Sequence, residues 1–151
     1  MREAGNVART WLATALIVFA APNAFADEAG PTQATPVRAF TRVPAPDGIQ
    51  IRRYNKANGA QPGKKDRVIV HYHGTLRDGT VFDSSVERRR PANFRMEQVI
   101  PCWSEALTRL HVGEKARLTC PPETAYGFKG SPPDIPPNAT LTFEIELLGV
   151  Q

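Results

Sequence analysis

The 151-residue sequence lacks the short motifs that mark several large classes of enzyme. It contains no glycine-rich phosphate-binding loop and no Gly-x-Ser-x-Gly nucleophile elbow, which excludes P-loop nucleotide hydrolysis and α/β-hydrolase chemistry. It also has only 3 histidines and 2 cysteines, so few side chains can bind a metal or act as a nucleophile. We therefore expect a protein that works without a nucleophile, a metal or another cofactor.

Long hydrophobic runs are also absent. The longest, Trp11 to Ala21, is well short of the roughly 20 apolar residues that a membrane-spanning helix needs, and Pro22 and Asn23 interrupt it. A membrane anchor is therefore the weaker interpretation of this segment, and we expect no stable membrane insertion.

The same run fits a signal peptide. Arg2 and Arg9 supply the positively charged start, and the small residues Ala24 and Ala26 follow the run at the place where a signal peptidase cuts. We predict cleavage after Ala26, which removes residues 1–26 and leaves a periplasmic or secreted protein. No cysteine lies directly after the run to carry a lipid.

Strong charge of either sign is missing as well. The net charge is +4, and loss of two basic and one acidic residue with the leader leaves about +3, too little to predict nucleic-acid binding. The densest basic run, Arg88-Arg89-Arg90, has no interleaved aromatic residues for base stacking. We interpret it as a solvated loop, with an acidic partner or membrane headgroups as the alternative.

Turn-forming residues, in contrast, are abundant, with 14 prolines and 11 glycines. They predict many turns and few long helices. Residues 27–46 contain four of the prolines and almost no apolar periodicity, so we predict a flexible Pro-rich tether there. The folded domain is expected over residues 47–151.

Hydrophobic patterns within that domain predict an α+β fold. Strands are expected at residues 49–51, 68–73, 81–83, 117–120 and 141–147. Trp103, Leu107 and Leu110 recur at helical spacing after Pro101, which predicts one short amphipathic helix, and Gly113 ends the turn that follows. A curved, mostly antiparallel sheet wrapped around this helix would bury the apolar faces of both.

Conventional catalytic groups are poorly placed in this arrangement. Cys102 and His111 flank the predicted helix, but nine residues of helix separate them by about 13 Å, well beyond hydrogen-bond reach. His71 and His73 share one face of a strand without a third metal ligand nearby, so we expect exposed strand histidines and no metal site.

Five segments follow one another in a distinctive order. They are Val70 to Gly74, Asp78 to Ser85, Gln98 to Trp103, Ala125 to Gly127 and Ile135 to Leu141. In this order they resemble the successive motifs of FKBP-type peptidyl-prolyl isomerases, over about Gly48 to Val150. Arg90 to Phe94 is similar to a Lys-Pro-Ala-Thr-Phe segment of the bacterial branch that includes the macrophage infectivity potentiators. That branch usually adds a helical dimerisation arm, for which this chain has no room, so we expect a monomer.

The resemblance implies a shallow aromatic pocket that receives a prolyl ring. Trp103 would form its floor, Tyr126 would donate its hydroxyl to a substrate carbonyl, and Tyr72 would orient Asp83. The expected catalytic residues are thus Asp83, Tyr126 and Trp103, and the Ile100 N–H would bind a second carbonyl. The expected substrate-binding walls are Tyr72, Phe82, Phe94, Val99, Ile100, Ile135 and Phe143.

The resemblance also implies the partners, which are proline-containing segments of exported proteins and macrolide inhibitors. Ala92 replaces an aromatic residue of the pocket rim, and Asp134 stands where an apolar residue is usual. The resemblance therefore specifies the reaction type more closely than the preferred ligand. Two alternatives remain. The aromatic residues could be ordinary core residues, or the groove could belong to a non-catalytic peptide-holding chaperone or adhesion module.

Cys102 and Cys120 are expected to form a disulfide, because the cysteine count is even and the protein is predicted to be exported. By resemblance, Cys102 stands just before the helix, where many relatives have glycine, and Cys120 ends the strand after it. The alternative is two buried free thiols.

Overall fold

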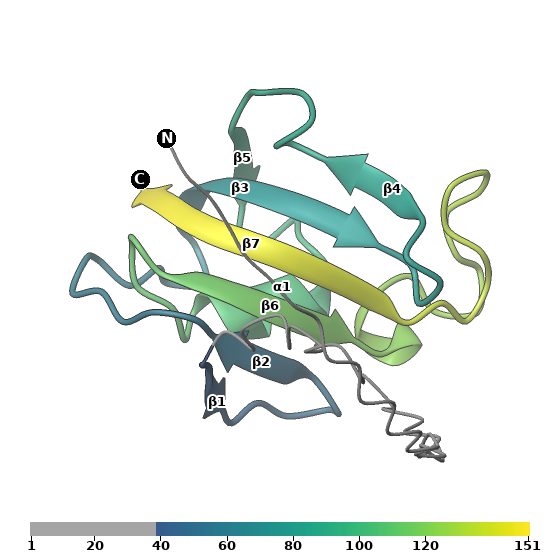
Figure 1. Ribbon diagram of the computed structural model, residues 1–151, viewed down its shortest axis with the longest axis horizontal. Helices are drawn as coiled ribbons and strands as arrows, with labels where there is room; N and C mark the ends of the chain where they lie inside the picture. The colour runs from purple at the N-terminus through teal and green to yellow at the C-terminus, as the bar shows by residue number, and fades with distance from the viewer. Residues whose placement is uncertain (1–38) are drawn as a thin grey trace, which may run out of the picture. The chain divides into compact units, whose positions relative to one another are not determined.

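The computed structural model describes residues 39–151, so the predicted signal peptide and the predicted tether up to residue 38 lie outside the described residues. Residues 39–151 form one antiparallel sheet with the strand order β1-β2-β6-β7-β3-β4, and β5 also pairs with β3 (Figure 1). The strands are β1 (Thr41–Val43), β2 (Gln50–Arg53), β3 (Arg67–Thr75), β4 (Val81–Ser84), β5 (Ala92–Arg95), β6 (Lys115–Cys120) and β7 (Leu141–Val150). With the helix α1 (Pro101–Leu107) and the short 3-10 helix η1 (Pro122–Thr124), this architecture confirms the predicted α+β fold.

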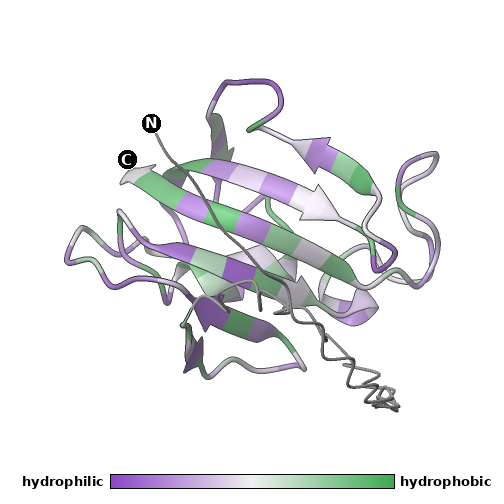
Figure 2. Cartoon of the chain, viewed as in Figure 1, coloured by the Kyte–Doolittle hydropathy of each residue, from purple (hydrophilic) through white to green (hydrophobic). Residues whose placement is uncertain are grey.

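The neighbouring strands β3 and β7 are the longest of the sheet. Along both, buried residues alternate with more exposed ones, and Figure 2 shows this alternation most clearly in β7, as green and purple bands. Val70 lies opposite Leu147 and Tyr72 opposite Ile145, so their apolar side chains share the buried face. Burial of each such side chain stabilises the fold by about 1.5 to 3 kcal/mol.

Helix α1 packs its apolar face into the same core. Pro101 occupies the first turn, where a missing N–H costs no hydrogen bond. The helix ends at Leu107, earlier than predicted, and the Thr108 hydroxyl donates back to the Ser104 carbonyl at 3.0 Å. Leu110 is fully buried in the turn that follows. The helical spacing therefore identified a core residue correctly but predicted a helix that is too long. Within residues 39–151 no helix is long and apolar enough to cross a bilayer.

The sequence did not predict two of the strands. β1 lies within residues 27–46, yet it pairs with β2, and Val43 lies opposite Ile51. β5 pairs with residues 67–70 of β3. Each is short and takes its main-chain partners from a strand elsewhere in the sequence, so local periodicity gives no signal for it. The tether interpretation is therefore wrong where β1 forms, and residues 27–38 lie outside the described part.

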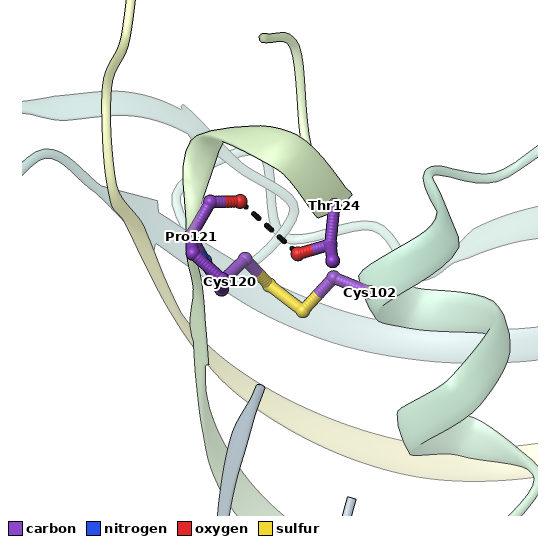
Figure 3. Close-up of a disulfide and its surroundings, with 4 residues drawn as sticks. All are labelled: Cys102, Cys120, Pro121 and Thr124. Atoms are coloured by element: carbon purple, nitrogen blue, oxygen red, sulfur yellow. Dashed lines mark hydrogen bonds between the residues drawn. A yellow bond between two sulfur atoms is a disulfide. The ribbon is translucent and has the colours of Figure 1, made fainter. Parts of the chain in front are cut away.

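The predicted disulfide between Cys102 and Cys120 is present, with their Cα atoms 5.7 Å apart. Figure 3 shows that it joins the first turn of α1 to the end of β6. The chain then turns through Pro121 into η1, where the Thr124 hydroxyl donates to the Pro121 carbonyl at 3.0 Å (Figure 3). The bond thus ties the start of the helix to the segment that leads into the β6–β7 loop.

Candidate active site

A cavity of about 270 Å³ lies between the sheet and the start of α1. Its lining comes from β3, β4, β5, the segment before α1, α1 itself, the β6–β7 loop and β7. The lining residues are Tyr72, Phe82, Asp83, Phe94, Gln98, Val99, Ile100, Trp103, Tyr126 and Phe143. The fold therefore brings together side chains that are up to 71 positions apart in the sequence, from Tyr72 to Phe143.

Trp103 is the centre of the aromatic cluster in this cavity. Its ring centroid lies 5.2 Å from that of Tyr72, 5.5 Å from that of Phe94 and 5.2 Å from that of Phe143, with the planes close to perpendicular in each pair. Edge-to-face packing of this kind is the favourable geometry for aromatic rings. Trp103 is only 5% exposed, so it forms an apolar floor that is fixed on several sides.

Gly74 lets two of the aromatic walls approach β3. A Cβ atom at this position would lie 2.6 Å from the Cζ atom of Phe82 and 3.1 Å from a ring carbon of Phe143. Those two rings pack against each other with their centroids 5.5 Å apart. Any larger residue in place of Gly74 must displace one of them, so this glycine shapes the cavity.

A polar network stands beside the aromatic floor. The Tyr72 hydroxyl donates to Oδ2 of Asp83, and Arg88 forms an ion pair with Oδ1 of the same carboxylate. Arg88 also donates from Nη2 to the Tyr72 hydroxyl at 2.9 Å. We predicted the contact between Tyr72 and Asp83, but interpreted the arginine run as a solvated loop. Arg88 is exposed as that interpretation expects, but its contact with Asp83 was not predicted.

These contacts set the protonation states of the network. Burial raises the pKa of the Tyr72 hydroxyl, and the hydrogen bond to the Asp83 carboxylate raises it further. Burial also raises the pKa of Asp83, but the hydrogen bonds from Tyr72 and Arg88 and the charge of Arg88 outweigh it and hold this pKa below its usual range. At neutral pH Asp83 is therefore ionised and Tyr72 protonated, as the hydrogen bond between them requires.

Several hydrogen-bond donors of cavity residues lack an acceptor within residues 39–151; one is the buried Nε1 of Trp103, and two others stand at the edge of the cavity. The Ile100 N–H stands at the N-terminal end of α1, and the Tyr126 hydroxyl stands in the loop after η1. Tyr126 is 42% exposed, while Gly127 beside it has φ of 60° and donates its N–H to the Pro122 carbonyl at 2.8 Å. The turn thus fixes Tyr126 at the rim with its hydroxyl available to a ligand.

The structure brings together all the site residues predicted from the sequence except Ile135. Ile135 is 5% exposed but does not line the cavity; its backbone pairs with Ser131 in the β6–β7 loop, through N–H···O contacts of 2.8 and 2.9 Å. Gln98 lines the cavity and was not predicted. It directly precedes Val99 and Ile100, so its position in the same motif could have identified it as a cavity residue.

The alternative catalytic groups lie elsewhere. Cys102 is bonded to Cys120 and has no thiolate to offer. Nδ1 of His71 lies 3.0 Å from the Ser85 hydroxyl, and Nδ1 of His73 lies 3.0 Å from the Ser84 hydroxyl. Both histidines thus have neighbouring hydroxyl partners, and neither lines the cavity.

Comparison with known proteins identifies the family. Residues 58–148 match the sequence profile of the family described as FKBP-type peptidyl-prolyl cis-trans isomerase. FK506-binding protein 1A of Emericella nidulans is 49% identical over 108 residues, which cover 68% of this chain and 98% of that protein. The chain belongs to the FKBP-type peptidyl-prolyl cis-trans isomerases.

Bacterial FKBP relatives match the same region. The FKBP-type 22 kDa peptidyl-prolyl cis-trans isomerase of Escherichia coli is 55% identical over 103 residues, 68% of this chain and 50% of that protein. The outer membrane protein MIP of Legionella longbeachae is 44% identical over 109 residues, 72% of this chain and 47% of that protein. The chain thus spans about half the length of these two relatives.

A solved structure confirms the FKBP fold. The peptidyl-prolyl cis-trans isomerase of Pseudomonas syringae pv. tomato superposes with a TM-score of 0.68 at 38% sequence identity, covering 73% of this chain and 80% of that one.

Proposed function

We propose that this FKBP domain catalyses cis–trans isomerisation of X-Pro bonds in exported proteins and so assists their folding. The observation that carries the proposal is the aromatic cavity with the unpaired donors of the Ile100 N–H and the Tyr126 hydroxyl at its edge. A prolyl ring is apolar and has a carbonyl on each side of it, so this combination of surface and donors suits it.

The reaction needs no covalent step. The barrier to rotation is about 18 to 20 kcal/mol because rotation breaks amide resonance, whose charge-separated form water stabilises. An apolar cavity excludes that water and favours the twisted, less polar amide over the planar one. Lowering the barrier by about 4 kcal/mol gives about a thousandfold acceleration, which a dry site with a few fixed dipoles can supply.

The proposed roles follow from the geometry. Trp103 supports the prolyl ring from below. The Tyr126 hydroxyl and the Ile100 N–H each donate a hydrogen bond to a substrate carbonyl. Asp83 stays ionised in one orientation because Tyr72 and Arg88 both bind it, so it contributes a fixed charge beside the rotating bond.

Export is the second part of the proposal. The predicted signal peptide supports it, and so does the Cys102–Cys120 disulfide, since disulfides persist mainly in oxidising compartments. One relative is named an outer membrane protein. Amino-terminal sequencing of the protein recovered from the periplasm should begin at Asp27 within a residue or two, and full-length protein free in the cytosol would contradict export.

Macrolide binding is the third part. The Emericella nidulans relative is named an FK506-binding protein, and we propose that the same cavity here accepts a macrolide. Rapamycin or FK506 should then inhibit turnover competitively with a prolyl peptide.

A direct assay distinguishes the isomerase from the peptide-holding alternative. The purified mature domain, shown to be folded by circular dichroism, should accelerate isomerisation of leucyl-prolyl and phenylalanyl-prolyl peptides. Peptide binding by folded protein without acceleration would favour the holding module.

A further inference from the structure

The β4–β5 loop, residues 85–91, lies beside the cavity, because Asp83 before it and Phe94 after it both line the cavity. The loop contains the three consecutive arginines of the chain, all exposed. Figure 2 shows this loop as a hydrophilic segment between β4 and β5. The isomerase mechanism uses only the first of these arginines, so the other two need a separate explanation.

The β4–β5 loop carries more positive than negative charge. Arg88 is paired with Asp83, so those two charges offset each other. Glu87, the one acidic residue of the loop, lies 3.9 Å from Nδ1 of His73. The guanidinium groups of Arg89 and Arg90 make no ion pair or hydrogen bond within residues 39–151. Asp83 and Glu87 offset two of the three arginine charges, so residues 83–90 keep a net charge of +1 beside the cavity.

The loop backbone is fixed by its own hydrogen bonds. The Arg89 N–H donates to the Val86 carbonyl at 3.0 Å, and the Arg90 N–H donates to the Ser85 carbonyl at 3.2 Å. Ser85 is fully buried, so this turn is anchored in the domain. The backbone of Arg89 and Arg90 is thus fixed, so binding a ligand here avoids the loss of backbone entropy that ordering a flexible loop would cost.

Arg89 also adopts a conformation that suits a different residue type. Its φ of 52° lies in the left-handed region, which glycine reaches without steric penalty and an arginine reaches only with strain. Strained non-glycine residues cluster at functional sites, where the side chain is needed. The side chain of Arg89 makes no hydrogen bond or ion pair within residues 39–151, which leaves it available to an external group.

We propose that Arg89 and Arg90 form an electrostatic subsite that favours client segments with acidic residues close to the proline. The inference deepens the proposed isomerase function and depends on it. Attraction between exposed charges acts over about 8 Å at physiological salt, and raises the encounter rate of complementary ligands. A membrane surface fits less well, because recognition of anionic lipids typically uses clusters of about four to eight basic residues.

A pair of peptides tests the subsite. One is an acetylated, amidated leucyl-prolyl peptide with glutamate three positions before and three positions after the proline; the other has glutamine at both positions. At about 20 mM salt the wild-type protein should turn over the glutamate peptide with a kcat/KM about three- to fivefold higher, and high salt should remove this preference. The double variant Arg89→Gln, Arg90→Gln should lose the preference and keep its rate on the glutamine peptide.

A charge-matched control comes from the opposite end of the sheet. Arg42 in β1 and Lys56 after β2 are exposed, and the strand order places β1 and β4 at opposite edges. The double variant Arg42→Gln, Lys56→Gln changes net charge equally and should keep the preference. Loss of the preference in this control as well would assign it to net charge and overturn the subsite.

The single variant Arg89→Gly separates charge from folding, because glycine relieves the strained φ. It should fold at least as well as the wild type by thermal melting and show a reduced preference; an undiminished preference would overturn the role of Arg89.

Equal turnover of both peptides by the wild type would overturn the subsite and leave the isomerase function intact. Turnover of neither peptide by folded protein would instead contradict the isomerase function, and with it the subsite. Co-sedimentation of the wild type, but not the double glutamine variant, with phosphatidylserine vesicles, together with no peptide preference, would assign the arginines to membranes.

Discussion

The Tyr72 hydroxyl donates a hydrogen bond to the Asp83 carboxylate, which lies eleven residues further along the chain. The contact spans the antiparallel pair β3 and β4, in which Asp83 lies opposite Gly74. Arg88 binds both side chains and closes the network. An ionised carboxylate is thereby held beside an aromatic floor, and its pKa is lowered as a consequence.

The lowered pKa of Asp83 predicts how stability depends on pH. A group whose pKa is depressed by folding stabilises the native state above its unfolded pKa, and this stabilisation is lost as pH falls through the folded pKa. The variant Asp83→Asn should therefore melt at a lower temperature than the wild type at pH 7, and the difference should shrink below about pH 4. Thermal melting of both proteins between about pH 2.5 and 7 checks this. A difference that stays constant over that range would show that ionisation of Asp83 contributes nothing to stability.

The Tyr126 hydroxyl has a predicted role in turnover and none in folding. Because it donates to nothing within residues 39–151, Tyr126→Phe should leave the melting temperature unchanged. It should lower kcat/KM by about two- to fivefold, which corresponds to the loss of one neutral hydrogen bond. Tyr54→Phe is the control, since Tyr54 bonds to Glu144 outside the cavity and should not affect the rate. An unchanged rate in Tyr126→Phe would remove this hydroxyl from the mechanism.

Trp103 is predicted to act in both turnover and folding, so its loss should reduce both activity and stability. Trp103→Ala removes the cavity floor and leaves a void in the core, which destabilises the fold by about 3 to 5 kcal/mol. The matched control is Leu107→Ala, which empties a buried position of the same helix that does not line the cavity. At a temperature where both variants are folded, only Trp103→Ala should lose most of its activity. Equal activity losses would mean that Trp103 acts only through stability.

The disulfide is expected to matter for stability and not for turnover. Seventeen residues lie between Cys102 and Cys120, and closing a loop of that size stabilises the fold by about 3 kcal/mol by restricting the unfolded chain. Reduction should therefore lower the melting temperature by roughly 10 to 20 °C. The isomerase rate at low temperature should stay largely unchanged, because neither sulfur lines the cavity. Mass spectrometry with thiol alkylation verifies the redox state. A marked loss of rate in reduced, folded protein would contradict the prediction.

The sequence could predict those parts of the site that depend on local sequence patterns. The order of the motifs identified the aromatic residues, and helical spacing identified Trp103 as part of a buried face. Gly74 was part of a quoted motif, although only the structure explains why a side chain does not fit there.

The features that the sequence could not predict depend on contacts that only the folded chain creates. Arg88 belongs to a charge run that is typical of a solvated loop, and only the path of the β4–β5 loop brings it to Asp83. β1 gains its partners from β2, which a proline-rich segment does not reveal. Ile135 lies in a matching motif, yet its loop pairs it with Ser131 and leaves it off the cavity wall.

The most direct test of the proposed activity is exchange NMR of a leucyl-prolyl peptide with and without the mature domain, at matched concentrations of the wild type and Trp103→Ala. Uncatalysed isomerisation takes tens of seconds or longer, and lowering the barrier by about 4 kcal/mol brings turnover to about a thousand times that rate. We predict exchange cross-peaks between the cis and trans peptide signals with the wild type, and their loss when a macrolide or Trp103→Ala is used. Absence of any acceleration by wild-type protein that is folded, on several different prolyl peptides, would contradict the isomerase function.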